Sequence, residues 1–156
     1  MTTKYDKDIA TEIILGFEAR PEMLVQILRA FVTRFSYLKE EAIRQISSEL
    51  NLSRAEVWGV VQFYHDFRTE PPGKTIVKIC QAEACQAMGS RELTSHAEKS
   101  LGIAMQSNSS DGKHTLEAVY CLGNCACSPA VMINDRVYGR VDSRRFDALL
   151  EKADAK

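Results

Sequence analysis

Apolar residues in the first half of the chain repeat at helical spacing. After Pro21 they alternate steps of one and three residues, so they share one stripe of a helix. A shorter helix is expected over residues 39–50. A third begins at Ser53, where Glu56 follows three residues later and completes the sequence signature of a capping box. The pattern therefore predicts three amphipathic helices that bury their apolar stripes against one another.

A run of two prolines and a glycine, from Glu70 to Gly73, divides the chain. These residues cannot continue a helix, and the periodicity of the apolar positions changes on either side of them. The sequence therefore predicts two domains, a helical domain over residues 1–70 and a second domain over residues 71–156.

The second domain mixes strand and helix patterns. The expected elements, in chain order, are a strand over 75–79, a helix over about 89–101, a short strand around 103–106, a strand over 115–120, hairpin strands over 130–133 and 136–141, and a final helix. Asn134 and Asp135 suit the hairpin turn, and Asp142 or Ser143 suits the cap of the last helix. This order predicts a small α+β sandwich with helices on a mixed sheet, for which a thioredoxin-like arrangement is the natural candidate.

Four of the five cysteines form two short pairs, Cys80-x4-Cys85 and Cys121-x3-Cys125. Each pair comes where a predicted strand runs out into a loop, so the four thiols are expected at one end of the sheet. Such a cage of thiolates suits an iron–sulfur cluster or zinc. Structural zinc also takes four cysteines at similar spacing, so spacing alone supports the two equally. The C-x-x-C signature of thioredoxin is absent, which argues against dithiol exchange.

The loops around these cysteines have properties that suit a metal centre. Gly123 and the small residues of the second loop allow close approach of the backbone. A helix that begins after Cys85 would bring its positive N-terminal end near the thiolates. The fifth cysteine, Cys127, is expected to be a small, half-buried neighbour of the second pair, although its spacing also allows it to replace Cys125 as a ligand.

Other kinds of site find little support. The histidines lie outside both cysteine loops, which argues against Rieske-type ligation; they are His65, His96 and His114. No nucleophile–base pair, phosphate loop or dinucleotide fingerprint is present in the sequence, so no catalytic site is expected on this chain.

Composition is that of an ordinary globular protein, with 45% apolar and 26% charged residues. The 20 basic and 21 acidic residues leave a net charge of −1 without a basic stripe, so nucleic acid is not an expected partner. The N-terminus does not resemble a signal peptide, and no apolar run is long enough for a membrane span. The chain is therefore expected to be cytoplasmic, where thiols stay reduced and metal ligation is favoured over disulfides.

Four motifs together resemble a known family. They are L-x-x-S-x-x-E-V-x-G-V-x-x-F-Y from Leu50 to Tyr64, C-x4-C from Cys80 to Cys85, C-L-G-x-C-x-x-[AS]-P from Cys121 to Pro129, and V-M-I-N-D-x-x-Y-G from Val131 to Gly139. This combination resembles the small thioredoxin-like [2Fe–2S] subunit of NADH-oxidising complexes. The family includes the E subunit of NADH-quinone oxidoreductase (respiratory complex I), the gamma subunit of soluble NAD-dependent formate dehydrogenases, and equivalent subunits of bidirectional hydrogenases.

The resemblance implies a three-helix segment followed by a thioredoxin-like [2Fe–2S] ferredoxin domain. It implies one [2Fe–2S] cluster on Cys80, Cys85, Cys121 and Cys125, and so favours iron–sulfur over zinc. The first ligand loop reads Cys-Gln-Ala-Glu-Ala-Cys-Gln-Ala-Met-Gly from residue 80 and looks most like that of the formate dehydrogenase gamma subunits.

The implied role is electron transfer, as a non-catalytic subunit of an NAD-dependent formate dehydrogenase. The cluster would exchange single electrons with the FMN of a flavin- and NAD-binding subunit, and through it with a molybdenum-containing subunit. FMN, NAD and the molybdenum cofactor would belong to those partners. The N-terminal helices would supply part of the docking surface, where Trp58 and Tyr64 suit half-exposed positions. Complex I and hydrogenase subunits are the alternatives within the family, and a structural zinc interaction module is the alternative outside it.

Overall fold

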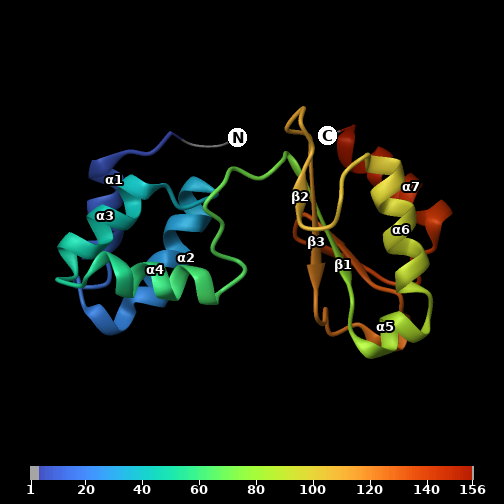
Figure 1. Cartoon of the computed structure of the whole chain (residues 1–156), viewed down its shortest axis with the longest axis horizontal. Helices are drawn as coiled ribbons and strands as arrows, with labels where there is room; N and C mark the ends of the chain where they lie inside the picture. The colour runs from blue at the N-terminus through green and yellow to red at the C-terminus, as the bar shows by residue number, and fades with distance from the viewer. Residues whose placement is uncertain (1–3, 156) are drawn as a thin grey trace. The chain divides into compact units, whose positions relative to one another are not determined.

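The computed structural model describes residues 4–155 and divides into two compact units (Figure 1). The first unit ends at Pro71 and the second begins at Pro72, so the division falls inside the proline-rich run. None of the helices within residues 4–155 has both the length and the apolar character needed to cross a membrane.

The first unit is built from helices. Its elements are α1 (Lys7–Leu15), the 3-10 turn η1 (Pro21–Met23), α2 (Leu24–Phe35), α3 (Glu40–Glu49) and α4 (Arg54–Phe63). The three expected helices are α2, α3 and α4, and α1 is an additional one. Asp6 caps α1, because its carboxylate accepts hydrogen bonds from the backbone N–H groups of Asp8 and Ile9. Only Ala10 and Ile14 of α1 are buried, and two positions are too few to show a helical period.

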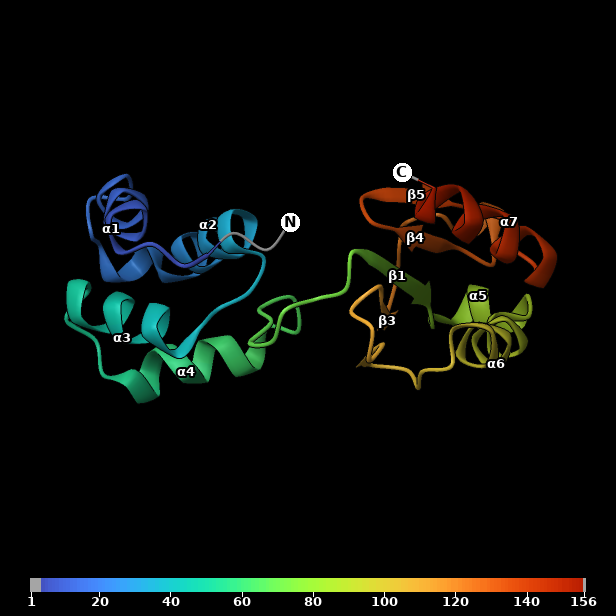
Figure 2. The same ribbon diagram turned by 90° about the horizontal axis from the view of Figure 1, so that it is seen from above.

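One apolar core joins these helices. Figure 2 shows α1 and α2 on one side of it and α3 and α4 on the other. The ring centroids of Phe31 and Phe35 lie 5.7 Å apart. The ring centroids of Phe35 and Tyr5 lie 5.5 Å apart. Ile46 of α3 and Val57 of α4 are buried in the same core. Each such side chain stabilises the fold by about 1.5–3 kcal/mol when fully buried, so the predicted stripes are the source of this unit's stability.

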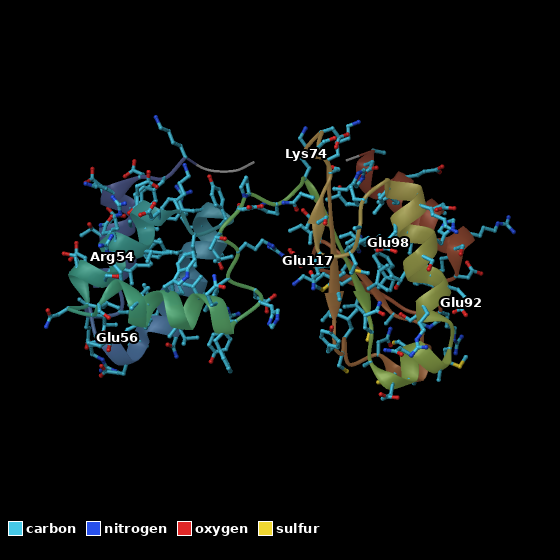
Figure 3. All side chains as sticks on the ribbon, in the orientation of Figure 1. Arg54, Glu56, Lys74, Glu92, Glu98 and Glu117 are labelled. Carbon is cyan, nitrogen blue, oxygen red and sulfur yellow. The ribbon has the colours of Figure 1, made fainter. Side chains whose placement is uncertain are left out.

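The N-terminus of α4, where Figure 3 labels Arg54 and Glu56, carries the capping box expected from the sequence. The Ser53 hydroxyl accepts the backbone N–H of Glu56 at 3.2 Å, and the Glu56 carboxylate accepts the backbone N–H of Ser53 at 2.8 Å. The hydrogen bonds from the Ser53 hydroxyl and backbone N–H hold the pKa of Glu56 below its ordinary value. Two N–H groups that the helix itself leaves unpaired are thereby satisfied.

The second unit contains a mixed five-stranded sheet in the order β2-β3-β1-β4-β5. Its elements are β1 (Thr75–Cys80), α5 (Glu83–Ala87), α6 (Ser90–Leu101), β2 (Ser107–Asn108), β3 (His114–Val119), the 3-10 turn η2 (Cys125–Cys127), β4 (Val131–Ile133), β5 (Arg136–Tyr138) and α7 (Ser143–Asp154). The central strand β1 runs parallel to β3 and antiparallel to β4. The two ligand loops follow β1 and β3, so this pairing positions the site.

Helices α6 and α7 pack together over one face of the sheet (Figure 1). Val77 and Ile79 of β1 point to this face and share a core with Leu93 of α6 and Phe146 of α7. The alternating apolar residues of β1 and the helically spaced apolar residues of α6 and α7 thus pack into one apolar layer.

The strand expected around residues 103–106 does not form there, and this prediction was wrong. The backbone N–H of Ile103 bonds to the carbonyl of Glu98 at 3.2 Å, and that of Met105 bonds to the Glu98 carboxylate at 2.8 Å. The segment therefore folds back onto the end of α6, and its donors are not free to pair with a strand. The strand begins later, where Ser107 and Asn108 pair with β3.

The last hairpin and helix form as expected. Asn134 adopts a φ of 52° in the turn between β4 and β5, a left-handed conformation that asparagine tolerates. Its side-chain oxygen also accepts the backbone N–H of Ile76 at 2.9 Å, which fastens the turn to β1. Asp142 caps α7 by accepting the backbone N–H of Arg145 at 2.7 Å.

We expect Ser53→Ala to destabilise the helical unit by about 1 kcal/mol, because it removes an N-cap acceptor. Trp58 is the chain's single tryptophan and lies in α4, so its fluorescence during urea unfolding reports on this unit. Ser48→Ala, an exposed position inside α3, is the matched control and is expected to leave the midpoint unchanged or slightly raised. Equal midpoints for Ser53→Ala and the wild type would contradict the role of the cap.

Candidate metal centre

The two ligand loops leave the sheet at the same edge. Parallel pairing sets Cys80 of β1 opposite Val119 of β3, so both strands end side by side. Strand β4 runs antiparallel to β1, with Val131 opposite Ile79, and this returns the second loop to the same edge. Figure 1 shows α5, which carries Cys85, at the end of the unit where β1 stops. The expected convergence of the loops is confirmed.

The cysteines fall into an inner pair, Cys80 and Cys85, and an outer pair, Cys121 and Cys125. Both thiols of the inner pair are buried, at 2% relative exposure each. Both residues of the outer pair are exposed. The two thiols of the inner pair influence each other's pKa, and the charges of Cys121 and Cys85 both raise the pKa of Cys125, so the four thiols lie near one another.

Burial and hydrogen bonding act differently on the inner pair. Burial is the main cause that raises the pKa of Cys80. Burial also raises the pKa of Cys85, but hydrogen bonds from Ser128, Ala130 and Cys80 outweigh it, and the net pKa of Cys85 is lowered. In the outer pair, the neighbouring charge of Cys121 raises the pKa of Cys125. Cys85 is thus the better stabilised thiolate of the inner pair.

Backbone N–H groups surround the sulfurs. Those of Ala82 and Leu122 donate to Cys80, and that of Ala130 donates to Cys85. Leu122 and Ala130 follow β3 in the chain, so their bonds run from the second ligand segment to ligands of the first. Hydrogen bonds to sulfur are one of the means by which a protein sets the potential of an iron–sulfur cluster.

Two kinds of metal centre suit four thiolates. A structural zinc needs all four sulfurs at about 2.3 Å from a single ion, whereas a [2Fe–2S] core has two irons to share four thiolates. Within residues 4–155, no three His, Cys, Asp or Glu side chains are already grouped around one position for a metal ion.

Cys127 lies apart from this network. Its backbone carbonyl accepts the N–H of Arg140 at 2.6 Å. A Cβ added to Gly139 would meet the Cβ of Cys127 at 2.6 Å and its carbonyl oxygen at 2.7 Å. Cys127 is thus packed against the end of β5, where Gly139 leaves room for it. This contact fits the expected packing role.

The backbone of the second loop is unusual at two positions. Cys121 adopts a φ of 151°, which residues other than glycine rarely occupy, and Gly123 adopts a φ of 68°. The backbone N–H of Gly123 donates to the Cys121 sulfur at 3.3 Å, in agreement with the close approach of the backbone expected there. Glycine is favoured there by its positive φ.

The first ligand loop contains a helix that the sequence did not predict. Cys85 lies inside α5, whose five residues are too few to show a period. The helix expected over about residues 89–101 forms as α6, which begins at Ser90 after Gly89 at a φ of 97°. The buried Ser90 hydroxyl donates to the carbonyl of Cys80 at 2.5 Å and ties the start of α6 to the site.

Ser128 is a site residue that sequence reasoning did not single out. Its hydroxyl oxygen lies 3.5 Å from the sulfur of Cys85. Its O–H group donates to the carbonyl of Cys125, with 2.8 Å between the two oxygens. The only signal in the sequence is its place in the [AS]-P ending of the second cysteine motif. Because alanine also satisfies that motif, the pattern does not call attention to a hydroxyl there.

Known proteins resemble this chain, some in sequence and one in a solved structure. The E subunit of NADH-quinone oxidoreductase from Buchnera aphidicola is 30% identical over 139 residues, covering 89% of this chain and 81% of that protein. The HndA subunit of the NADP-reducing hydrogenase from Solidesulfovibrio fructosivorans is 30% identical over 142 residues, covering 89% of this chain and 83% of that protein. Both relatives are subunits of oxidoreductases.

A chain in the crystal structure of an NAD+-reducing [NiFe]-hydrogenase, air-oxidized, matches with a TM-score of 0.74 and 27% sequence identity. The match covers 85% of this chain but only 23% of that chain, so the protein corresponds to one part of a much longer polypeptide. The expected thioredoxin-like α+β class is confirmed. Residues 10–154, which include most of both units, match the sequence model described as thioredoxin-like [2Fe–2S] ferredoxin. The chain therefore belongs to the thioredoxin-like [2Fe–2S] ferredoxin family.

Proposed function

We propose that the inner and outer cysteine pairs bind one [2Fe–2S] cluster, and that the chain is the electron-transfer subunit of a soluble NAD-dependent formate dehydrogenase. The cluster type and the electron-transfer role follow from the family. The observation that carries the ligand assignment is the convergence of both cysteine loops at one edge of the sheet. A zinc interaction module, which spacing alone left open, is not proposed, because the family is an iron–sulfur one.

The inner and outer cysteine pairs differ in their exposure to solvent and therefore in their roles at this site. A bound [2Fe–2S] cluster takes up and releases one electron at a time. The inner pair is buried, so it holds its side of the site away from water. The outer pair reaches the surface, so it faces the electron partner. The N–H groups of Leu122 and Ala130 offset the negative charge that the thiolates bring.

The helical unit offers a surface for the flavin- and NAD-binding partner. The α4 patch consists of exposed residues on the outer face of that helix, namely Ala55, Trp58, Gly59, Gln62 and Phe63. These five residues are uncharged, with the exposed Arg54 and Glu56 on either side of Ala55 in the chain, and Trp58 and Phe63 are 43% and 75% exposed. Among the residues that the structure describes, nothing lies within 4 Å of a Cβ on Gly59, so none of their contacts requires glycine there. A glycine inside a helix costs about 1 kcal/mol relative to alanine, and a closely docked partner would explain it.

The first ligand loop supports formate dehydrogenase as the parent complex, because its Gln-Ala-Glu-Ala sequence resembles the gamma subunits of that enzyme. Oxidation of formate to CO2 releases one proton and two electrons, and reduction of NAD+ to NADH consumes them. Passing those electrons singly is the part we assign to this chain. The names of the relatives favour the E subunit of complex I or a hydrogenase subunit as the second candidate.

Purified protein is expected to be brown, to hold about two irons and two sulfides, and to give an EPR signal only after reduction. Cys125→Ser is expected to lose most of this iron, because it removes a ligand of the outer pair. Cys127→Ser, the matched control two residues away, is expected to keep it. Iron and sulfide analysis with EPR measures all three proteins.

Two results would contradict this assignment. A colourless protein with one zinc would overturn the cluster itself. Loss of iron in Cys127→Ser with retention in Cys125→Ser would show that the fourth ligand had been assigned wrongly, while leaving the cluster in place.

Phe63→Ala is expected to weaken binding to the flavin-binding subunit roughly tenfold, because truncating an exposed aromatic at the centre of an interface typically costs more than 1 kcal/mol. Leu15→Ala is the matched control, since Leu15 is 60% exposed but lies on α1, outside the patch. Affinity is measured by titrating purified partner onto immobilised chain. Equal affinity of both variants and the wild type would exclude the α4 patch as the docking surface.

Capture of the tagged chain from its native cells tests the parent complex. We expect it to bring down a flavin-binding subunit and a molybdenum-containing subunit, with formate-dependent reduction of NAD+ in the eluate. Mass spectrometry, metal analysis and absorbance at the NADH band provide the measurements. Recovery of quinone oxidoreductase subunits, or of hydrogen-dependent NAD+ reduction, would replace formate dehydrogenase by the corresponding alternative.

A further inference from the structure

Ser128 is the one residue whose side chain lies against both cysteine pairs in the hydrogen bonds described above. It is 8% exposed, and its oxygen lies 3.5 Å from the Cys85 sulfur of the inner pair. The same oxygen lies 2.8 Å from the backbone carbonyl of Cys125 in the outer pair. The contact with the Cys85 sulfur is buried and the contact with the Cys125 carbonyl is partly buried, so water does not readily replace the hydroxyl at the sulfur.

The Ser128 hydroxyl has one proton and lies beside two possible acceptors, the Cys85 sulfur and the Cys125 carbonyl oxygen. With Cys85 as a thiol, that cysteine can donate to Ser128, and the hydroxyl proton goes to the Cys125 carbonyl. A metal-bound Cys85 has lost its proton and can only accept. The Cys125 carbonyl also receives the backbone N–H of Ser128 at 3.3 Å, so it keeps a partner when the hydroxyl turns away.

We propose that, once the cluster is bound, the Ser128 hydroxyl donates its hydrogen bond to the Cys85 sulfur and raises the reduction potential of the cluster. Reduction adds negative charge, part of which falls on the ligand sulfurs. A donor at sulfur therefore stabilises the reduced state more than the oxidised state. Ser128 is a positioning and tuning residue, and it binds no metal itself. This inference rests on the ligand assignment proposed above.

Two features of the surroundings make this donor important. The Cys85 thiol is 2% exposed, so protein groups are its main hydrogen-bond donors. Ser128 and Ala130 both form hydrogen bonds with Cys85. Pro129 lies between them in the chain and has no N–H to contribute.

Ser128→Ala tests the proposal in the holoprotein. Losing one net hydrogen bond is expected to lower the equilibrium constant for one-electron reduction about tenfold, a shift of about 59 mV to lower potential for a one-electron couple. Potentiometric titration followed by EPR measures it. Ser128→Thr keeps a hydroxyl at the same position and is expected to retain the wild-type potential.

Ser90→Ala is the matched control. Ser90 is also a buried serine beside a ligand, but its hydroxyl donates to the backbone carbonyl of Cys80 rather than to a sulfur. Its loss is expected to leave the potential unchanged, even if the protein becomes less stable. An equal fall in potential for Ser90→Ala and Ser128→Ala would overturn the specific role of the O–H···S bond.

Resonance Raman spectra give a second readout, whose band positions a change in loop stability alone would not shift. Transfer of wild-type protein to D2O is expected to shift an Fe–S(Cys) stretching band, because the proton bonded to sulfur exchanges. This component of the shift is expected to disappear in Ser128→Ala. A Ser128→Ala protein that holds its cluster with unchanged potential and unchanged deuterium shift would refute the inference. Absence of any cluster in the wild type would instead refute the proposed function.

Discussion

Everything at the metal centre depends on the position of β1 between β3 and β4. Parallel pairing with β3 brings the ends of two strands together, and each end leads into a cysteine pair. Antiparallel pairing with β4 then holds the far end of the second loop against the first, with Val131 opposite Ile79. Because the hydrogen bonds of the sheet set these positions, the pairing of the strands brings both cysteine loops to one edge. The apolar layer under α6 and α7 holds the strands in this order.

The same geometry gives the site an inside and an outside. The inner pair is buried among backbone donors, and the outer pair lies at the surface. Backbone N–H groups from the second ligand segment reach sulfurs of the first, so neither loop can move without disturbing the other's ligands. An electron-transfer site benefits from this division, since one side is shielded from water and the other is open to a partner.

The helical unit is organised more simply, because its periodic apolar residues form one core. The remaining question is why α4 keeps, on one exposed face, two aromatic rings and a glycine that no contact among the described residues requires. Such a face is costly in isolation, because it leaves apolar surface in water and weakens the helix. Its presence is consistent with a chain that works as one subunit of a complex.

Much could be predicted from the sequence by itself. Helical spacing located α2 to α4, the Ser53 and Glu56 pair marked a helix start, and strand ends next to cysteines indicated one shared site. These features are local, and a residue and its near neighbours are enough to specify them. The cysteine motifs also identified the family, because spacing and flanking residues are preserved in the linear order. The α1 helix and α5 escaped prediction, since each leaves too few buried positions to show a period.

Only the tertiary structure decided which atoms meet. The contact of Ser128 with Cys85 joins residues 43 positions apart, and the close fit of Gly139 on Cys127 depends on how β5 returns to the ligand loop. The division of the cysteines into an inner and an outer pair, and the folding of Met105 back onto Glu98, likewise depend on the path of the chain in space. No local pattern encodes such contacts, because they form only when sheet pairing and helix packing have placed distant segments together. The sequence determined which residues are available to the site, and the packed fold decided which of them act on one another.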